Sequence, residues 1–158
     1  MAESVASGLP PDLSTAAATL VAAAAVPQRT RRALIADPSA TPEMLTAAAA
    51  TLDLATLHAV AEHPRTPPET LWAVYLVAPP QTLGALAENP NTPYEALFYI
   101  AQDWSIDTRV MVPILRSLAG HPAANDEILE LVACHPDSDD TVQEIVAASR
   151  SLVVATSE

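Results

Sequence analysis

The chain has 158 residues, half of them hydrophobic and six aromatic, with nineteen acidic residues against seven basic ones and a formal net charge of −12. Such a surface repels phosphate backbones and acidic membranes, which argues against binding to nucleic acid or to a membrane. Three glycines and no Asn-Gly or Asp-Gly turn, in a sequence rich in Ala and Leu, predict an all-α domain.

The first predicted element is an apolar run at 16–26. Three arginines follow it: Arg29, Arg31 and Arg32. The run is too short to span a bilayer and no positive segment precedes it, so we expect a helix of a cytoplasmic protein rather than a signal or anchor. A first helix pair is predicted over 13–25 and 30–36. The arginines either contact an anionic ligand or form a solvated helix start that pairs with carboxylates.

The next segment repeats itself with a period of 26 residues. Its anchors are Pro38, Pro64 and Pro90, and Leu45, Leu71 and Leu97. In each copy a proline that ends one helix is followed within a few residues by Thr-Pro and a glutamate, which begin the next helix. A period of this length is typical of helix pairs that bury their apolar faces against neighbouring copies.

The Thr-Pro steps predict where the helices begin. A threonine hydroxyl before the proline is expected to accept a free backbone N–H, and in Thr66-x-x-Glu69 and Thr92-x-x-Glu95 the glutamate would complete a capping box. Two helices then fit between one start and the next stop. The predicted helices are 42–51, 54–62, 67–77 and 81–88.

The pattern changes after residue 100. Pro122 follows Pro90 by 32 residues, and we expect Pro113 to split the added stretch into a short helix and a second one ending near Gly120. Helices are then predicted over 126–134 and 141–153, capped by Asn125 and by Asp139 or Asp140. We therefore predict a single domain with a capping repeat at 1–37, regular repeats at 38–100 and irregular repeats at 101–158.

The segment Ala87-Glu88-Asn89-Pro90-Asn91-Thr92-Pro93, with Glu95 and Leu97 behind it, resembles the variant leucine-rich repeat family of bacterial proteins. The resemblance covers residues 34–100. It implies a right-handed α-solenoid, here of about five stacked helix pairs, similar in layout to HEAT and armadillo arrays. It further implies that some second helices are 3₁₀, that the protein binds a partner, and that there is no common catalytic site.

The aromatic residues are the candidate partner-binding residues. They lie close together in the sequence: Trp72, Tyr75, Tyr94, Phe98, Tyr99 and Trp104. The helical period predicts that Leu71, Val74 and Ala78 in one repeat, and Leu97, Ile100 and Trp104 in the next, form the core stripe. Packing between repeats is the simpler interpretation for Trp72, Phe98 and Trp104. For the three tyrosines, packing and display at a binding surface both stay open.

Three histidines precede prolines, namely His63, His121 and His135, where Asp37 and Asn89 stand in other copies. Because Asn and Asp replace them, we interpret all five as caps of helix ends. A metal site from Cys134, His135 and His121 is the alternative, although it lacks CxxC or HExxH spacing. The single cysteine excludes an internal disulfide.

Neither a phosphate loop nor a GxSxG nucleophile is present, so we expect no enzyme activity, cofactor or metal. The predicted function is a scaffold that binds a protein partner, possibly basic or a second copy of the chain, through the aromatic residues and the acidic surface. One alternative is an acidic mimic of nucleic acid that occupies a basic surface of a DNA-binding protein. Another is a helical-repeat enzyme or metal-binding accessory protein.

Overall fold

A computed structural model of the chain describes residues 35–156, which form α-helices joined by turns and contain no strand. The helices are α3 (Pro42–Ala49), α4 (Leu54–Glu62), α5 (Pro68–Val77), α6 (Pro80–Glu88), α7 (Tyr94–Ala101), α8 (Thr108–Ala119), α9 (Asp126–Cys134) and α10 (Asp140–Thr156). The all-α prediction is confirmed. The first predicted pair, at 13–25 and 30–36, lies almost entirely outside the described residues.

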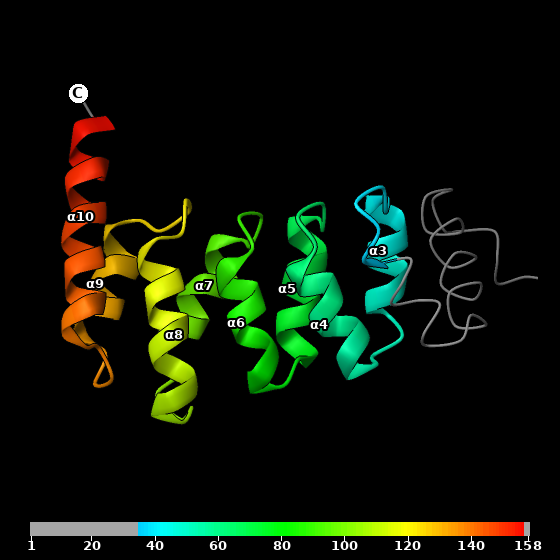
Figure 1. The fold of residues 1–158 in the computed structure, drawn as a ribbon, viewed down its shortest axis with the longest axis horizontal. Helices are drawn as coiled ribbons and strands as arrows, with labels where there is room; N and C mark the ends of the chain where they lie inside the picture. The colour runs from blue at the N-terminus through cyan, green and yellow to red at the C-terminus, as the bar shows by residue number, and fades with distance from the viewer. Residues whose placement is uncertain (1–34, 157–158) are drawn as a thin grey trace, which may run out of the picture.

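The helices follow one another along the long axis of the molecule (Figure 1). Each odd-numbered helix packs on the next odd-numbered one, from α3 to α9, and each even-numbered helix on the next even-numbered one, from α4 to α10. The result is an odd layer and an even layer. Each helix also packs on its sequence neighbour across the layers, which gives four helix pairs in the described part of the chain.

The 26-residue period places leucines at equivalent positions in the odd layer. Leu45, Leu71 and Leu97 are each the fourth residue of their helix and are fully buried. Leu129 occupies the same position in α9, after the longer interval of 32 residues. Together with leucines of the even layer they belong to one continuous core. The insertion after residue 100 therefore leaves the packing register of the odd layer unchanged.

Three of the predicted side-chain caps are present. Thr41 accepts a hydrogen bond from the Met44 N–H at 3.3 Å, and Asn125 accepts one from the Ile128 N–H at 3.0 Å. Of the two candidates before α10, Asp139 makes the contact, with the Val142 N–H at 2.8 Å. These contacts satisfy N–H groups that the first helical turn leaves without a partner.

The predicted caps and capping boxes at Thr66 and Thr92 are wrong. Their hydroxyls donate to carbonyl oxygens at the end of the preceding helix, Thr66 to Val60 and Thr92 to Leu86, both at 2.6 Å. Both threonines are buried, and the prolines that follow them take the N-cap position without a side-chain cap. A buried hydroxyl needs a partner, and the carbonyl at the helix end, which also accepts the backbone N–H of His63 or Asn89, supplies one. The threonines thus close the end of one helix rather than open the next.

The residues before the helix-ending prolines act as caps, as predicted. Asp37, His63, Asn89 and His121 each accept a hydrogen bond from the N–H two residues further along the chain, at 2.8–3.1 Å. In each case the carbonyl oxygen also accepts from the N–H three residues on, which closes a tight turn. The four turns are therefore alike, and three of them follow the even-numbered helices α4, α6 and α8.

A second contact of three of these side chains joins one repeat to the one before it. His63 Nε2 lies 3.2 Å from the Asp37 carbonyl oxygen, Asn89 Nδ2 lies 2.9 Å from that of His63, and His121 Nε2 lies 2.8 Å from that of Asn89. Asn89 also donates to the Ala61 carbonyl at 2.7 Å. We call this chain of side-chain-to-carbonyl bonds the turn ladder. It fixes the register of neighbouring repeats along one edge of the molecule.

Two expectations about helices are wrong. Pro113 does not split a helix but lies inside the continuous helix α8. Pro113 has no N–H to donate to the carbonyl of Arg109, but both residues are exposed and this carbonyl can hydrogen-bond to water. On the buried side of α8, Met111, Ile114 and other core residues hold the helix on both sides of the proline. The second helices α4, α6 and α8 are α-helical rather than 3₁₀.

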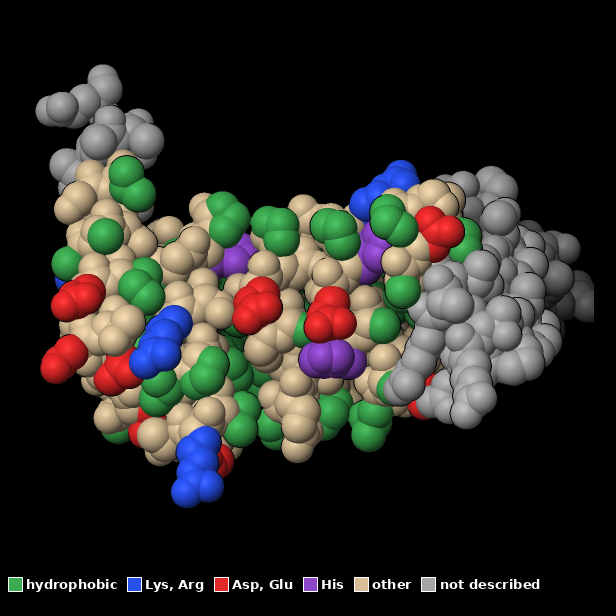
Figure 2. All heavy atoms as spheres, viewed as in Figure 1, with side chains coloured by type: hydrophobic (Ala, Val, Ile, Leu, Met, Phe, Trp, Pro, Cys, Tyr) green, Lys and Arg blue, Asp and Glu red, His purple; other side chains and the backbone are tan. Residues whose placement is uncertain are grey.

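Across residues 35–156, every helix is too short or too polar to cross a membrane. On the face shown in Figure 2, acidic, basic and apolar side chains are interspersed among small ones, without a continuous basic area. This face offers no basic surface to a polyphosphate chain.

Candidate protein interaction surface

Five aromatic side chains of α5 and α7 form one cluster on the odd layer. The ring of Tyr99 is central, with its centroid 6.0 Å from Trp72, 6.3 Å from Tyr75 and 5.7 Å from Phe98. Trp72 stacks on Tyr75 at 5.4 Å, and Tyr94 lies 5.8 Å from Phe98. These separations suit favourable aromatic pairs. We call these five residues the aromatic cluster.

The helical period explains why the aromatic cluster lies at the edge of the core. Leu71 is fully buried, and Trp72, one position further round α5, is only half-buried. Phe98 stands in the same relation to Leu97 in α7, and Tyr99, a further position round, is 50% exposed. The rings pack on one another between neighbouring repeats and still leave part of their surface to solvent. The rings of the aromatic cluster are therefore partly packed between repeats and partly displayed at the surface, so each of the two interpretations of the sequence describes part of their environment.

Trp104 is not part of the aromatic cluster, and its predicted place in the core stripe is wrong. It is 67% exposed, in the turn between α7 and α8, and its ring meets that of His135 edge-on at 6.1 Å. The reason is that α7 ends at Ala101, so the helical period on which the prediction rested stops three residues before Trp104. Ala101 itself is fully buried and completes the core side of α7.

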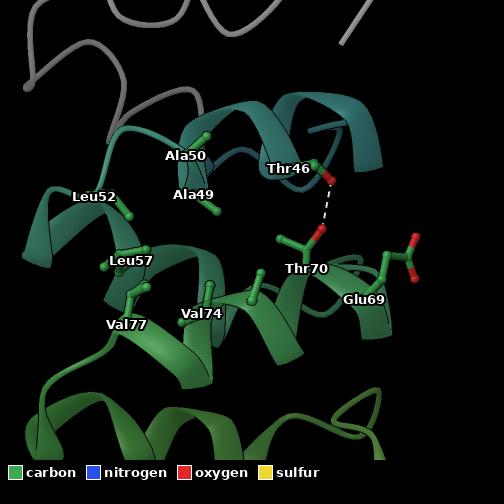
Figure 3. Close-up of a pocket in the computed structure, with 10 residues that line it drawn as sticks. Thr46, Ala49, Ala50, Leu52, Leu57, Glu69, Thr70, Val74 and Val77 are labelled. Carbon is green, nitrogen blue, oxygen red and sulfur yellow. Dashed lines mark hydrogen bonds between the residues drawn. The ribbon is translucent and has the colours of Figure 1, made fainter. Parts of the chain in front are cut away.

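An apolar groove of about 280 Å³ lies between α3 and α5, beside the aromatic cluster. Figure 3 shows Leu52, Leu57 and Val77 gathered at one end of the groove, with Val74 nearer the middle and Glu69 at the other end. A hydrogen bond of 2.7 Å between the hydroxyls of Thr46 and Thr70 crosses from one wall to the other. The groove has the size of a pocket for side chains of a partner rather than for a large ligand.

A conspicuous feature of the groove is the backbone of Leu52. Its φ of 54° lies in the left-handed region, and its side chain is 60% exposed. A bulky residue in this conformation is uncommon and costs about 1 kcal/mol. An exposed, strained leucine contributes little to the core, which favours a role at the surface.

Sequence reasoning did not identify the groove or a column of glutamates beside it. Glu43, Glu69, Glu95 and Glu127 are each the second residue of an odd-numbered helix, and all four are exposed. We call them the glutamate column. The 26-residue spacing of the first three was visible in the sequence, where it was attributed to helix capping alone. The pKa of Glu43 is held below its ordinary value by a hydrogen bond with its own backbone N–H and a second with the Thr41 hydroxyl.

Two tyrosines of the aromatic cluster have raised pKa values. The Tyr94 hydroxyl donates to Oε2 of Glu127, and this hydrogen bond, followed by partial burial, raises the pKa of Tyr94 above its ordinary value. Burial, and then the nearby charge of Asp103, raises the pKa of Tyr75. Both phenols therefore stay protonated near neutral pH, and the O–H of Tyr94 is already donated to Glu127.

The proposed metal ligands are not brought together. His121 precedes α9 and His135 follows it, so the nine-residue helix separates them, and Cys134 is exposed. No group of three or more potential ligands occurs within residues 35–156. His135 accepts the Asp137 N–H like the other caps, but it lies after an odd-numbered helix and takes no part in the turn ladder. Its buried Nε2 atom has no hydrogen-bond partner and lies beside Trp104 instead.

The predicted arginine cluster, Arg29, Arg31 and Arg32, lies outside the described residues. Within those residues the basic side chains are few: Arg65, Arg109, Arg116 and Arg150. Arg116 pairs with Asp139 on the outside of the last repeat. Comparison of the chain with models of protein families, with curated proteins and with solved structures found no match.

Proposed function

We propose that the chain is a non-enzymatic protein interaction module, built as a right-handed α-solenoid in the manner of variant leucine-rich repeats and working in the cytoplasm. The repeated helix pairs, the equivalent buried leucines and the turn ladder support the solenoid. Regular α-helices in the second position of each pair depart from what that family resemblance implies.

The aromatic cluster is the observation that carries the proposal. Five rings meet on the outside of two neighbouring helices, and Leu76 and Val77 beside them are 63% and 50% exposed. An apolar area of this kind is typical of protein contacts, where aromatic residues supply much of the binding energy. Because the rings already pack on one another, they lose little side-chain freedom when a partner binds.

The nucleic-acid mimic has less support. Double-stranded DNA carries one charge per roughly 3.4 Å along each strand. The glutamate column has one carboxylate on each odd-numbered helix, and neighbouring helices lie about 10 Å apart. The apolar groove and the aromatic cluster also have no counterpart in a phosphate backbone. A protein partner with an apolar contact face fits the surface better.

The proposal is tested by removing two rings of the aromatic cluster. Affinity purification from the native cell, with quantification by mass spectrometry, compares the native chain with a variant carrying Trp72→Ala and Tyr99→Ala. Trp104→Ala is the matched control, because it removes an exposed ring outside the cluster. We expect the double variant to lose a partner that the native chain and the control retain. Equal retention by all three proteins, with equal helix content by circular dichroism, would overturn the proposal.

Self-association is a distinguishable outcome of the same test. If the partner is a second copy of the chain, sedimentation of the purified native protein shows a dimer that the double variant lacks. In that case the aromatic cluster is a homo-oligomer contact.

A further inference from the structure

The apolar surface of the odd layer extends across α5 from its second turn to its end, and the charged residue of this helix, Glu69, lies in the first turn. Ala73 and Val77 line the groove toward α3, and Trp72 and Tyr75 belong to the aromatic cluster toward α7. Beyond Thr70, the polar side-chain groups of α5 are the indole N–H of Trp72 and the hydroxyl of Tyr75, and both belong to the aromatic cluster. One apolar face of a partner can therefore contact the groove and the aromatic cluster together.

The charge beside this surface has one sign. Helices α3, α5, α7 and α9 carry six acidic residues and no basic one. The nearest described arginine, Arg65, lies in the turn before α5, where its charge acts on Glu43. Among the described residues, Glu69, Glu95 and Glu127 form no ion pair, and Glu127 accepts a hydrogen bond from the neutral Tyr94 hydroxyl. Such a surface attracts cations and repels anionic partners.

From this combination we infer that the partner contributes a basic amphipathic helix, an inference that rests on the proposed function. The helix lies across the odd-numbered helices, with apolar side chains in the α3–α5 groove and on the aromatic cluster. Its lysine or arginine side chains pair with Glu69 and Glu95, the two members of the glutamate column on α5 and α7. An amphipathic helix in an apolar groove is a recurring mode of peptide recognition.

The repeat spacing sets the pattern of basic residues in the partner. Neighbouring packed helices lie about 8–10 Å apart, so successive glutamates of the column are separated by about that distance. An α-helix rises about 10.5 Å in seven residues and presents the same face again after that interval. The partner helix is therefore expected to carry basic residues seven positions apart, flanking its apolar stripe.

Synthetic helical peptides of three heptads test the inference against the whole chain. The first has a leucine stripe and one lysine at the same position in each heptad. In the second peptide, glutamates replace those lysines. The third peptide has the same composition as the first, but its lysines lie on the helix face opposite the leucine stripe. Affinities are measured by fluorescence anisotropy at low and at high salt.

We expect the first peptide to bind on the order of tenfold more tightly than either of the others, because each exposed ion pair contributes modestly. High salt should reduce that preference. The variant Glu69→Lys with Glu95→Lys should reverse the preference and favour the glutamate peptide. Glu88→Lys together with Glu62→Lys is the matched control, with the same change in charge on the exposed side of α4 and α6, and should leave the preference unchanged.

The outcomes separate this inference from the proposed function. Suppose the lysine and glutamate peptides bind equally well and both lose binding in the variant with Trp72→Ala and Tyr99→Ala. That result would overturn the inference of a basic partner and would leave the proposed aromatic interaction surface in place. Binding of none of the peptides would also overturn the inference, and the capture experiment with the double alanine variant then decides the proposed function by itself. If Glu69→Lys with Glu95→Lys unfolds the chain, the variant Glu69→Gln with Glu95→Gln serves instead. It should abolish the preference for the lysine peptide over the glutamate peptide.

Discussion

His121 donates a hydrogen bond from Nε2 to the carbonyl oxygen of Asn89, 2.8 Å away, and so joins the turn after α8 to the turn after α6. The tautomer follows from the partners, because Nδ1 of His121 accepts the Ala123 N–H and a carbonyl oxygen can only accept. The neutral ring with its proton on Nε2 is thus the form that links the two repeats. Protonation of Nδ1 would remove the acceptor that holds the turn.

The turn ladder predicts that Asn89 is important for stability and that histidine can replace it. Asn89→Ala removes two donated hydrogen bonds and one accepted one in a buried setting, so we expect a loss of about 2–4 kcal/mol in the free energy of unfolding. Asn89→His should lose much less, because His63 and His121 make the equivalent contacts. Urea denaturation of the three proteins measures the effect. Equal losses in both variants would show that the side chain acts only by filling space.

The turn ladder also predicts a dependence of stability on pH. Burial lowers the pKa of His121 below its ordinary value of 6.5, although the bond with Asn89 opposes this. The unfolded chain therefore binds a proton at this site at a higher pH than the folded chain does, and stability falls as the pH drops below about 6.5 until the folded ring is protonated too. Above that window the site contributes no pH dependence.

The variant His121→Asn isolates this contribution, because asparagine fulfils the same role at position 89 without titrating. We expect its free energy of unfolding to fall less than that of the native chain between about pH 7.5 and pH 5.5. The other histidines are common to both proteins and cancel in the comparison. Parallel stability curves for the two proteins would contradict the prediction.

The sequence was sufficient for features that depend on repetition. Leu45, Leu71 and Leu97 were predicted to share one environment, and they do, because a stacked array imposes the same burial on each copy. Features set by single contacts across repeats were not accessible. Thr66 looked like a cap because Thr-Pro is a common helix start, and only the position of the Val60 carbonyl shows that it closes the previous helix. The same holds for the groove, which forms where α3 and α5 pack side by side with α4 between them in the sequence.

Leu97 and Trp104 allow a direct test of where the core ends. Leu97→Ala removes a fully buried side chain and is expected to cost about 2–5 kcal/mol. Trp104→Ala removes a larger side chain that is 67% exposed, and its loss should stay below about 1 kcal/mol. Thermal and urea denaturation of both variants measure the difference. A large loss for Trp104→Ala would mean that its contact with His135 supports the turn after α9 more than its exposure indicates.

At position 52 we expect glycine to give a more stable protein than alanine, which is the reverse of their usual order. Because its φ is 54°, Leu52→Gly relieves backbone strain that Leu52→Ala retains, and both variants lose the same largely exposed side chain. We expect the glycine variant to be more stable than the alanine variant by about 1 kcal/mol. Matched urea denaturation curves decide this, and alanine as the more stable variant would contradict the left-handed conformation. Both variants should bind the lysine peptide more weakly, since both remove a leucine that lines the groove.

The hydrogen bond between Tyr94 and Glu127 gives the interaction surface a spectroscopic signal. The pKa of Tyr94 is held above its ordinary value of 10.0, mainly by this hydrogen bond. Partial burial and the negative charge of Glu127 raise the pKa further. The phenol should therefore ionise at a higher pH than a free tyrosine, as followed by phenolate absorbance, and Glu127→Gln should lower its pKa by removing the negative charge. Tyr94→Phe identifies which step of the titration belongs to this residue, and circular dichroism across the same range checks that the chain stays folded. A Tyr94 step that does not move in Glu127→Gln would show that the carboxylate has no hold on the phenol.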